Sequence, residues 1–117
     1  MKRALGIDLG EARIGVAVSD ELGMLAHALE TIVVKDTRDP IARVVQLANE
    51  KDVGHVIVGL PKNMDGTTGP AAEKARAFAE KLKEQLTCPV RLWDERLTTV
   101  AAQIILQGWL DAQAFAV

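Results

Sequence analysis

The hydrophobic and polar positions of the N-terminal part of the chain form short apolar runs separated by turn-forming residues. Such runs predict β-strands. They cover residues 4–8, 14–19 and 29–34. Gly10 allows a turn between the first two runs, and the connections are short. We therefore expect three neighbouring strands in an antiparallel meander.

After residue 38 the pattern alternates between helical and extended segments. Asp39-Pro40 resembles a helix cap followed by proline in the first helical position. The expected elements are a helix from Pro40 that stops at Gly54, a strand over His55–Gly59, a helix over 70–86, a strand over 90–94 and a helix over 97–110. This order implies parallel, right-handed crossovers. The chain is thus predicted to be an α/β protein, a mixed five-stranded sheet with helices on both faces.

The composition fits one ordinary domain. The chain has 117 residues, of which 49% are apolar and 26% charged, and this argues against disorder. Its single cysteine, Cys88, excludes an internal disulfide. No apolar run approaches the ~18 residues of a membrane span, and no secretory signal is recognisable. We expect a cytoplasmic protein with no membrane partner.

The charge balance weakens the simplest argument for a nucleic-acid partner. Acidic residues outnumber basic ones by 16 to 14, but an enzyme that holds metal ions on carboxylates also looks acidic. Aromatic residues make up only 3% of the chain, with no tyrosine. This disfavours a surface that stacks single-stranded bases. Trp93 and Trp109 are expected in the core.

Acidic residues stand at the ends of two predicted strands. Asp8 ends the first strand and Asp94-Glu95 ends the last. In a layered α/β domain such ends meet in a crevice where ligands bind. Carboxylates gathered there repel one another unless a cation such as Mg²⁺ or Mn²⁺ neutralises them. The alternative, in which they are turn caps and solvated strand-end acids, stays open.

Two further segments carry hydrogen-bond donors. The loop after the buried strand contains Lys62, Asn63 and Thr67. It has the usual position of a binding loop, although a plain strand-to-helix turn explains it equally well. Arg96 could contact a phosphate or pair with Asp94.

Taken together, these segments are similar to the YqgF (RuvX) family. The matching segments are GIDLG over 6–10 with RIGVAVSD over 13–20, VGLPKNMDG over 58–66 and DERLTT over 94–99. The resemblance implies a ribonuclease H-like fold and a nuclease that processes the 5′ end of pre-16S ribosomal RNA in ribosome biogenesis. It also implies a divalent metal, Mg²⁺ or Mn²⁺, on Asp8 and Glu95, whereas Asp94 need not be a ligand. Arg13, Lys62, Asn63 and Arg96 are candidates for contacts with substrate phosphates.

The sequence departs from the family pattern in one place. Family members usually carry a basic connection and a third aspartate before their last apolar helix. Here Val100 runs directly into Ala101, and no Lys or Arg follows Arg96. We expect a single ribonuclease H-like domain over 1–117 with a further loop between 100 and 101 that the printed sequence omits. The alternative is a truly shortened and catalytically impaired chain.

Several functions stay open on this basis. The first is the metal-dependent endonuclease acting on structured RNA. The second is a Holliday-junction resolvase acting on branched DNA, which needs a two-fold dimer for two coordinated cuts. The third is a non-catalytic RNA-processing factor. An ATPase of the actin-like kind is excluded because it needs two such domains. The sequence leaves open whether the protein is a monomer or a homodimer.

Overall fold

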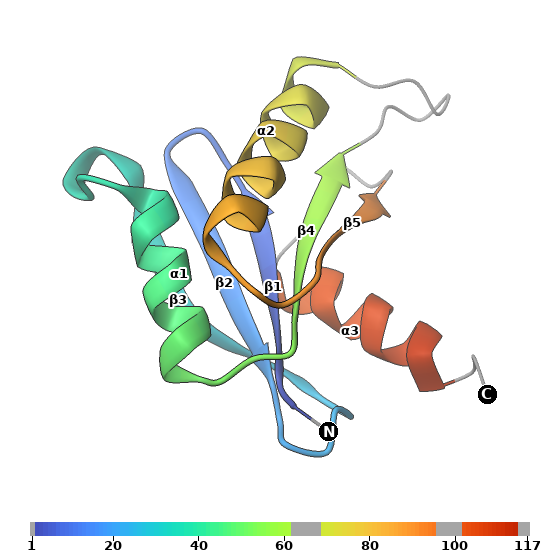
Figure 1. Ribbon diagram of the computed structural model, residues 1–117. Coiled ribbons are helices and arrows are strands. Elements are labelled where there is room, and N and C mark those ends of the chain that lie inside the picture. Colours follow the sequence, from blue (N-terminus) through green and yellow to red (C-terminus); the bar gives the residue numbers. More distant parts are fainter. Residues whose placement is uncertain (1, 62–68, 96–101, 115–117) are drawn as a thin grey trace.

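The computed structural model describes the chain except residues 1, 62–68, 96–101 and 115–117 (Figure 1). Five strands and three α-helices follow one another in the described part. They are β1 (Ala4–Leu9), β2 (Arg13–Ser19), β3 (Ala26–Val33), α1 (Pro40–Glu50), β4 (His55–Pro61), α2 (Pro70–Gln85), β5 (Val90–Glu95) and α3 (Ala102–Ala114), with a 3-10 turn η1 (Val34–Asp36) before α1.

The strands form one mixed sheet in the order β3-β2-β1-β4-β5. β2 pairs antiparallel with both β1 and β3, whereas β1, β4 and β5 run parallel. The carboxyl ends of β1, β4 and β5 therefore lie at one edge of the sheet, together with the turn between β1 and β2 (Figure 1). The predicted mixed five-stranded sheet is confirmed.

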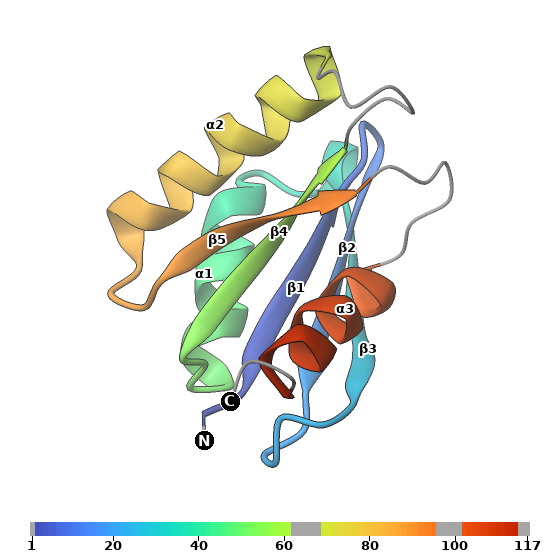
Figure 2. The same cartoon turned by 90° about the vertical axis from the view of Figure 1, so that its right-hand side faces the viewer.

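Helices cover both faces of the sheet, as predicted: α1 and α2 lie on one face, and α3 lies on the other (Figure 2). The alternation of each strand separates two hydrophobic clusters. The cluster under α1 and α2 is built on large side chains such as Leu5, Ile7 and Val58. The cluster under α3 uses small strand residues such as Ala4 and Ala17. Small residues there let α3 approach the sheet closely.

Gly6 is the point of closest approach between β1 and α3. A Cβ added at Gly6 would lie 2.6 Å from the Leu106 Cβ and 2.9 Å from the Ala102 carbonyl oxygen. Neither neighbour is the free end of a flexible side chain. Glycine is therefore the one residue that fits at position 6 while α3 keeps its position.

The ends of α1 follow from local backbone chemistry. The Asp39 carboxylate accepts a hydrogen bond from the Ala42 amide at 3.2 Å, and Pro40 occupies the first turn. The helix ends earlier than the predicted stop at Gly54. Asp52 has a positive φ of 48°, and the Val53 amide donates to the Ala48 carbonyl. Asp52 thus takes the left-handed position that glycine usually fills.

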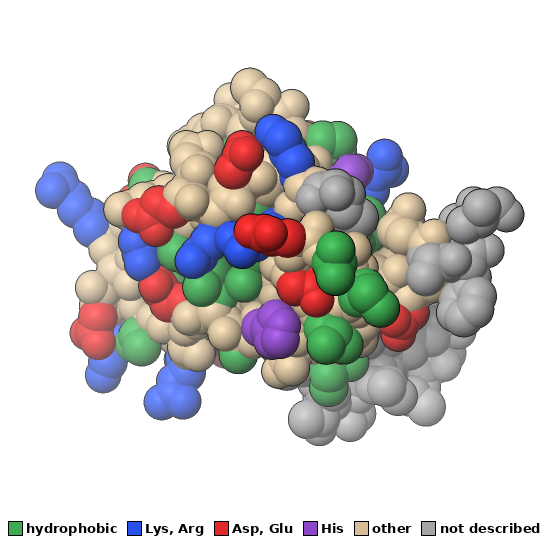
Figure 3. Space-filling view, turned by 90° about the horizontal axis from the view of Figure 1, so that it is seen from below, with side chains coloured by type: hydrophobic (Ala, Val, Ile, Leu, Met, Phe, Trp, Pro, Cys, Tyr) green, Lys and Arg blue, Asp and Glu red, His purple; other side chains and the backbone are tan. Residues whose placement is uncertain are grey.

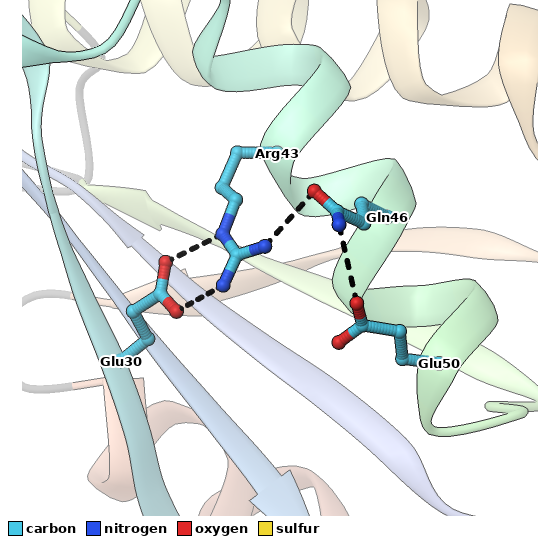
Figure 4. A network of polar contacts seen from close by, with 4 residues as sticks. All are labelled: Glu30, Arg43, Gln46 and Glu50. Atoms are coloured by element: carbon cyan, nitrogen blue, oxygen red, sulfur yellow. Dashed lines mark hydrogen bonds and ion pairs between the residues drawn. The ribbon is translucent and has the colours of Figure 1, made fainter.

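A polar network fastens α1 to the edge strand β3 (Figure 4). The Arg43 guanidinium donates to both carboxylate oxygens of Glu30, the Nε to Oε2 distance being 2.8 Å. Arg43 also donates to Gln46, and Gln46 donates to Glu50. The forked pair holds a helix to a strand 13 positions earlier in the chain.

Three further boundaries differ by two or more residues from those predicted. β3 begins at Ala26 instead of residue 29, since its pairing with β2 continues past a bulge between Val16 and Ala17. The Gln107 side chain of α3 also accepts from the Ala26 amide. β4 continues to Pro61, and α3 continues to Ala114. The expected start of the last helix at 97 lies outside the described residues.

Hydrophobic side chains gather at the end of the molecule opposite the carboxyl edge (Figure 3). Leu22, Met24 and Leu25 in the turn between β2 and β3 are 75%, 64% and 56% exposed. Among the described helices, none has the length and apolar character needed to cross a membrane.

Candidate active site

Asp8 lies near the carboxyl end of β1, on the sheet face that α3 covers. Its partner across the antiparallel ladder is Gly15 of β2. A Cβ placed at Gly15 would lie 3.7 Å from the Asp8 Cβ and 3.6 Å from the Ala102 Cβ. Asp8 therefore lies beside the first residue of α3.

The electrostatic environment of Asp8 is unusual for a carboxylate. The side chain is half-buried, and this burial raises its pKa above the ordinary value of 3.8. No described residue donates a hydrogen bond to Asp8 or forms an ion pair with it. A cation bound here would supply the missing counter-charge.

Glu95 is the last residue of β5, where its backbone is in register with Pro61 of β4. Positions 8 and 95 thus lie at one edge of the sheet, with β4 between their strands. The Glu95 side chain lies outside the described part of the structure. Two strand spacings separate β1 from β5 by about 10 Å. Asp94 is exposed, at the register position of Leu60.

The candidates for phosphate contacts are only partly described. Arg13 opens β2 at the same edge as Asp8, and its side chain is exposed. Its carbonyl accepts a hydrogen bond of 2.9 Å from the Gly10 amide, which closes the turn between β1 and β2. Lys62, Asn63 and Arg96 lie outside the described residues, as do Thr67 and Val100-Ala101.

Two residues at this edge were not singled out from the sequence. Gly15 has no side chain and leaves the space beside Asp8 open. Its position within a run of β-branched residues is the sequence feature that could have identified it. Lys74 of α2 reaches the β1–β2 turn, where its Nζ lies 3.9 Å from the Glu11 carboxylate. Lys74 belongs to a helix rich in exposed lysines, so its sequence gave no reason to prefer it.

The described residues bring no group of three His, Cys, Asp or Glu side chains together as metal ligands. Of the two acids proposed as metal ligands, Asp8 and Glu95, only Asp8 has a described side chain. A complete ligand set at this edge would need Glu95 or residues outside the described ranges. The half-buried carboxylate without a counter-charge fits a hard divalent cation as one such ligand.

Comparison with known proteins identifies relatives of this chain. A protein of Thermoanaerobacter pseudethanolicus named "Putative pre-16S rRNA nuclease" is 50% identical over 104 residues, which cover 89% of this chain and 75% of the relative. A protein of Myxococcus xanthus with the same name is 44% identical over 133 residues, covering 94% and 88%.

The fold itself is also found in a solved structure. RuvC of Thermus thermophilus is similar with a TM-score of 0.59 at 16% identity, over 97% of each chain. This likeness confirms the predicted ribonuclease H-like fold. The sequence profile of the family RuvX, described as Holliday junction resolvase, matches residues 2–108. The chain therefore belongs to the RuvX family.

Proposed function

We propose that this chain is a metal-dependent endonuclease that processes the 5′ end of pre-16S rRNA in the cytoplasm during ribosome biogenesis. The observation that carries the proposal is the half-buried Asp8 carboxylate, which has no counter-charge among the described residues. It stands at the carboxyl edge of a ribonuclease H-like sheet. The relatives named after pre-16S rRNA support the choice of substrate.

Asp8 and Glu95 are the residues proposed to hold Mg²⁺ or Mn²⁺. Both are hard oxygen donors, and their strands end at the same edge. Bound there, such ions stabilise the charge that develops on the oxygens of a phosphodiester. Arg13, Lys62, Asn63 and Arg96 are proposed to contact substrate phosphates. An exposed arginine such as Arg13 suits this role because its planar fork matches phosphate oxygens.

A segment missing between Val100 and Ala101 is proposed to complete the site. The match to the Myxococcus xanthus relative spans 133 residues, more than the 117 of this chain, so that relative has residues without a counterpart here. In the sequence the junction lies one residue before Ala102, which lies beside Asp8. An acid and several basic residues inserted there would stand next to the proposed metal.

The test is cleavage of a pre-16S precursor in the presence of Mg²⁺ or Mn²⁺. The chain is assayed as it is and with the relative's extra residues inserted between 100 and 101. We expect the insertion to raise the rate at least about tenfold, and Asp8→Asn to abolish it. Asp36→Asn, an exposed acid on η1, is the matched control. Full activity in the Asp8 variant would remove the proposed role.

The second candidate is a Holliday-junction resolvase, which the family description favours. The same acids would act on branched DNA, but a four-way junction requires two coordinated cuts and therefore a two-fold dimer. Sedimentation of the protein with a junction tests this. A strict monomer that cuts the RNA precursor and leaves the junction intact would decide for the first candidate. Binding without metal-dependent cleavage of either would indicate a non-catalytic factor.

A further inference from the structure

A cavity of about 590 Å³ lies between the edge strand β5 and helix α3 and takes no part in the proposed metal site. Residues of three elements line it. They are His55 of β4, Val90, Arg91, Leu92 and Trp93 of β5, and Trp109 and Gln113 of α3. This volume is large enough for one heterocyclic ring with its sugar.

The cavity gathers rings that are scarce in this chain. Both tryptophans and one of the two histidines line it, although aromatic residues make up only 3% of the sequence. His55 and Trp109 have ring centroids 5.1 Å apart and planes tilted by 44°. Trp109 is buried with 5% exposure, whereas His55 and Trp93 are half-buried. Both half-buried side chains therefore keep some exposed surface and line the cavity.

Trp93 is fixed in this wall by α3. A Cβ added at Gly108 would lie 3.2 Å from the Trp93 Nε1, so the indole packs directly against the helix backbone. A ring held in this way loses little freedom when a ligand stacks on it. Trp93 also stands two residues before Glu95 in β5. The cavity and the proposed metal site thus share a strand and a face of the sheet.

The rim of the cavity is polar and carries a positive charge. Arg91 is exposed and forms no ion pair with any described residue. Burial and the nearby Arg91 charge lower the pKa of His55 below 6.5, so its ring is neutral at neutral pH. Gln113 adds an exposed amide that can both donate and accept. The outer edge of β5 also faces away from the sheet, with no neighbouring strand in the described fold.

We infer that this cavity binds an unpaired nucleobase of the RNA substrate, a few nucleotides from the bond that is cut. The base stacks on the rings of Trp93 and His55, Gln113 reads its edge and Arg91 contacts the adjoining phosphate. Stacking on aromatic rings beside a cation is how proteins hold single-stranded nucleic acid. The inference rests on the proposed function. Arg91 favours a polyanion over an extended peptide laid along the β5 edge.

Tryptophan fluorescence reports on this cavity directly. The chain has no tyrosine, and both of its tryptophans line the cavity. The non-cleaving Asp8→Asn protein is titrated with a short single-stranded oligoribonucleotide and, separately, with an abasic oligomer of the same length and charge. We expect the oligoribonucleotide to quench the fluorescence and the abasic oligomer to leave it unchanged.

Variants assign the binding to named side chains. Trp93→Leu should weaken binding of labelled oligoribonucleotide by about 5- to 150-fold, the range expected for one stacked base. Arg91→Gln, on the protein surface, should weaken binding without affecting folding. Arg38→Gln, an exposed arginine between η1 and α1 without an ion pair among the described residues, should bind normally.

The outcomes separate this inference from the proposed function. Equal quenching by the abasic oligomer would overturn base stacking. Quenching by an extended aromatic peptide and not by RNA would also overturn it, in favour of a peptide groove. Base-dependent quenching, together with a wild-type protein that cleaves no precursor, would support the cavity and count against the nuclease. The last outcome is that the oligoribonucleotide causes no quenching and the Trp93 and Arg91 variants cleave the precursor with an unchanged KM. It would overturn base binding in the cavity and leave the proposed nuclease function standing.

Discussion

Gly15 faces Asp8 across the β1–β2 ladder, and a Cβ at position 15 would touch Asp8 and Ala102 at ordinary contact distances. Alanine therefore fits, whereas we expect the two γ-methyl groups of valine to crowd Asp8 and Ala102. We expect Gly15→Ala to keep stability and most activity. Gly15→Val should lower precursor cleavage by about 100-fold, because it displaces the Asp8 carboxylate. Cleavage rates and circular dichroism check this, and a Val variant with normal kinetics would contradict it.

Asp8→Asn should make the metal-free protein more stable at neutral pH while removing activity. Burial raises the folded-state pKa of Asp8, so its ionised form is disfavoured in the folded state and costs stability above that pKa. The cost disappears as the pH falls below the ordinary value of 3.8, where both states are protonated. Thermal unfolding in chelator at neutral and acidic pH measures the difference. Added Mg²⁺ or Mn²⁺ should raise the Tm of the wild type only.

Glu30→Gln should have the opposite pH dependence. The Arg43 guanidinium lowers the pKa of Glu30, so the pair stabilises the fold above the ordinary value of 4.5. This contribution is lost as the pH falls through the lower folded-state pKa. We expect a loss of about 1 kcal/mol at neutral pH, which shrinks toward zero in acid. Glu50→Gln, at a carboxylate that accepts a hydrogen bond from Gln46 and forms no ion pair with Arg43 within 4 Å, should cost less. Equal losses at both pH values would contradict the pairing.

Gly6→Ala should destabilise the fold by about 1–3 kcal/mol, because α3 must move away from β1. The added methyl group would overlap the Leu106 Cβ and approach the Ala102 carbonyl. Urea unfolding measures the change. Gly69→Ala is the matched control, since a Cβ there meets no atom of the described residues within 4 Å. A Gly6 variant as stable as the control would show that α3 is not held closely.

Asp52→Gly should stabilise the protein by about 0.5–1 kcal/mol. Asp52 takes a left-handed conformation at the end of α1, which glycine adopts without the steric cost of a Cβ. The lost pair with Lys2 is 3.3 Å long and exposed, so it contributes little. Asp52→Ala should be less stable than either. We expect the urea midpoint to be highest for Asp52→Gly, intermediate for the wild type and lowest for Asp52→Ala.

The apolar runs in the sequence predicted the strands well. Helices cover both faces of the sheet, so most strand residues are buried and apolar. The sequence pattern also indicated that Asp8 and Glu95 end strands at one edge, since parallel strands end together. It missed the early start of β3, where His27 and Ala28 are exposed and show no apolar alternation. There the strand is set by its neighbours β2 and α3.

The pattern of hydrophobic and polar residues did not predict contacts between distant parts of the chain. Nothing in the spacing of Glu30 and Arg43 distinguishes them from other exposed charges. The low aromatic content disfavoured a stacking surface, yet the fold places His55, Trp93 and Trp109 around one cavity. Composition counts residues over the whole chain, whereas a site needs only a few of them in one place. The roles of Asp8 and Glu95 stay a prediction.

Among the described elements, α3 alone covers one face of the sheet, and it follows all five strands in the chain. During synthesis the ribosome releases the N-terminal strands first. Ala4, Ala17, Ala26 and Ile57 then remain exposed until α3 has left the exit tunnel and docked. A nascent chain that stalls between β5 and α3 would present this bare face to the cell, where a chaperone or another unfinished chain could cover it.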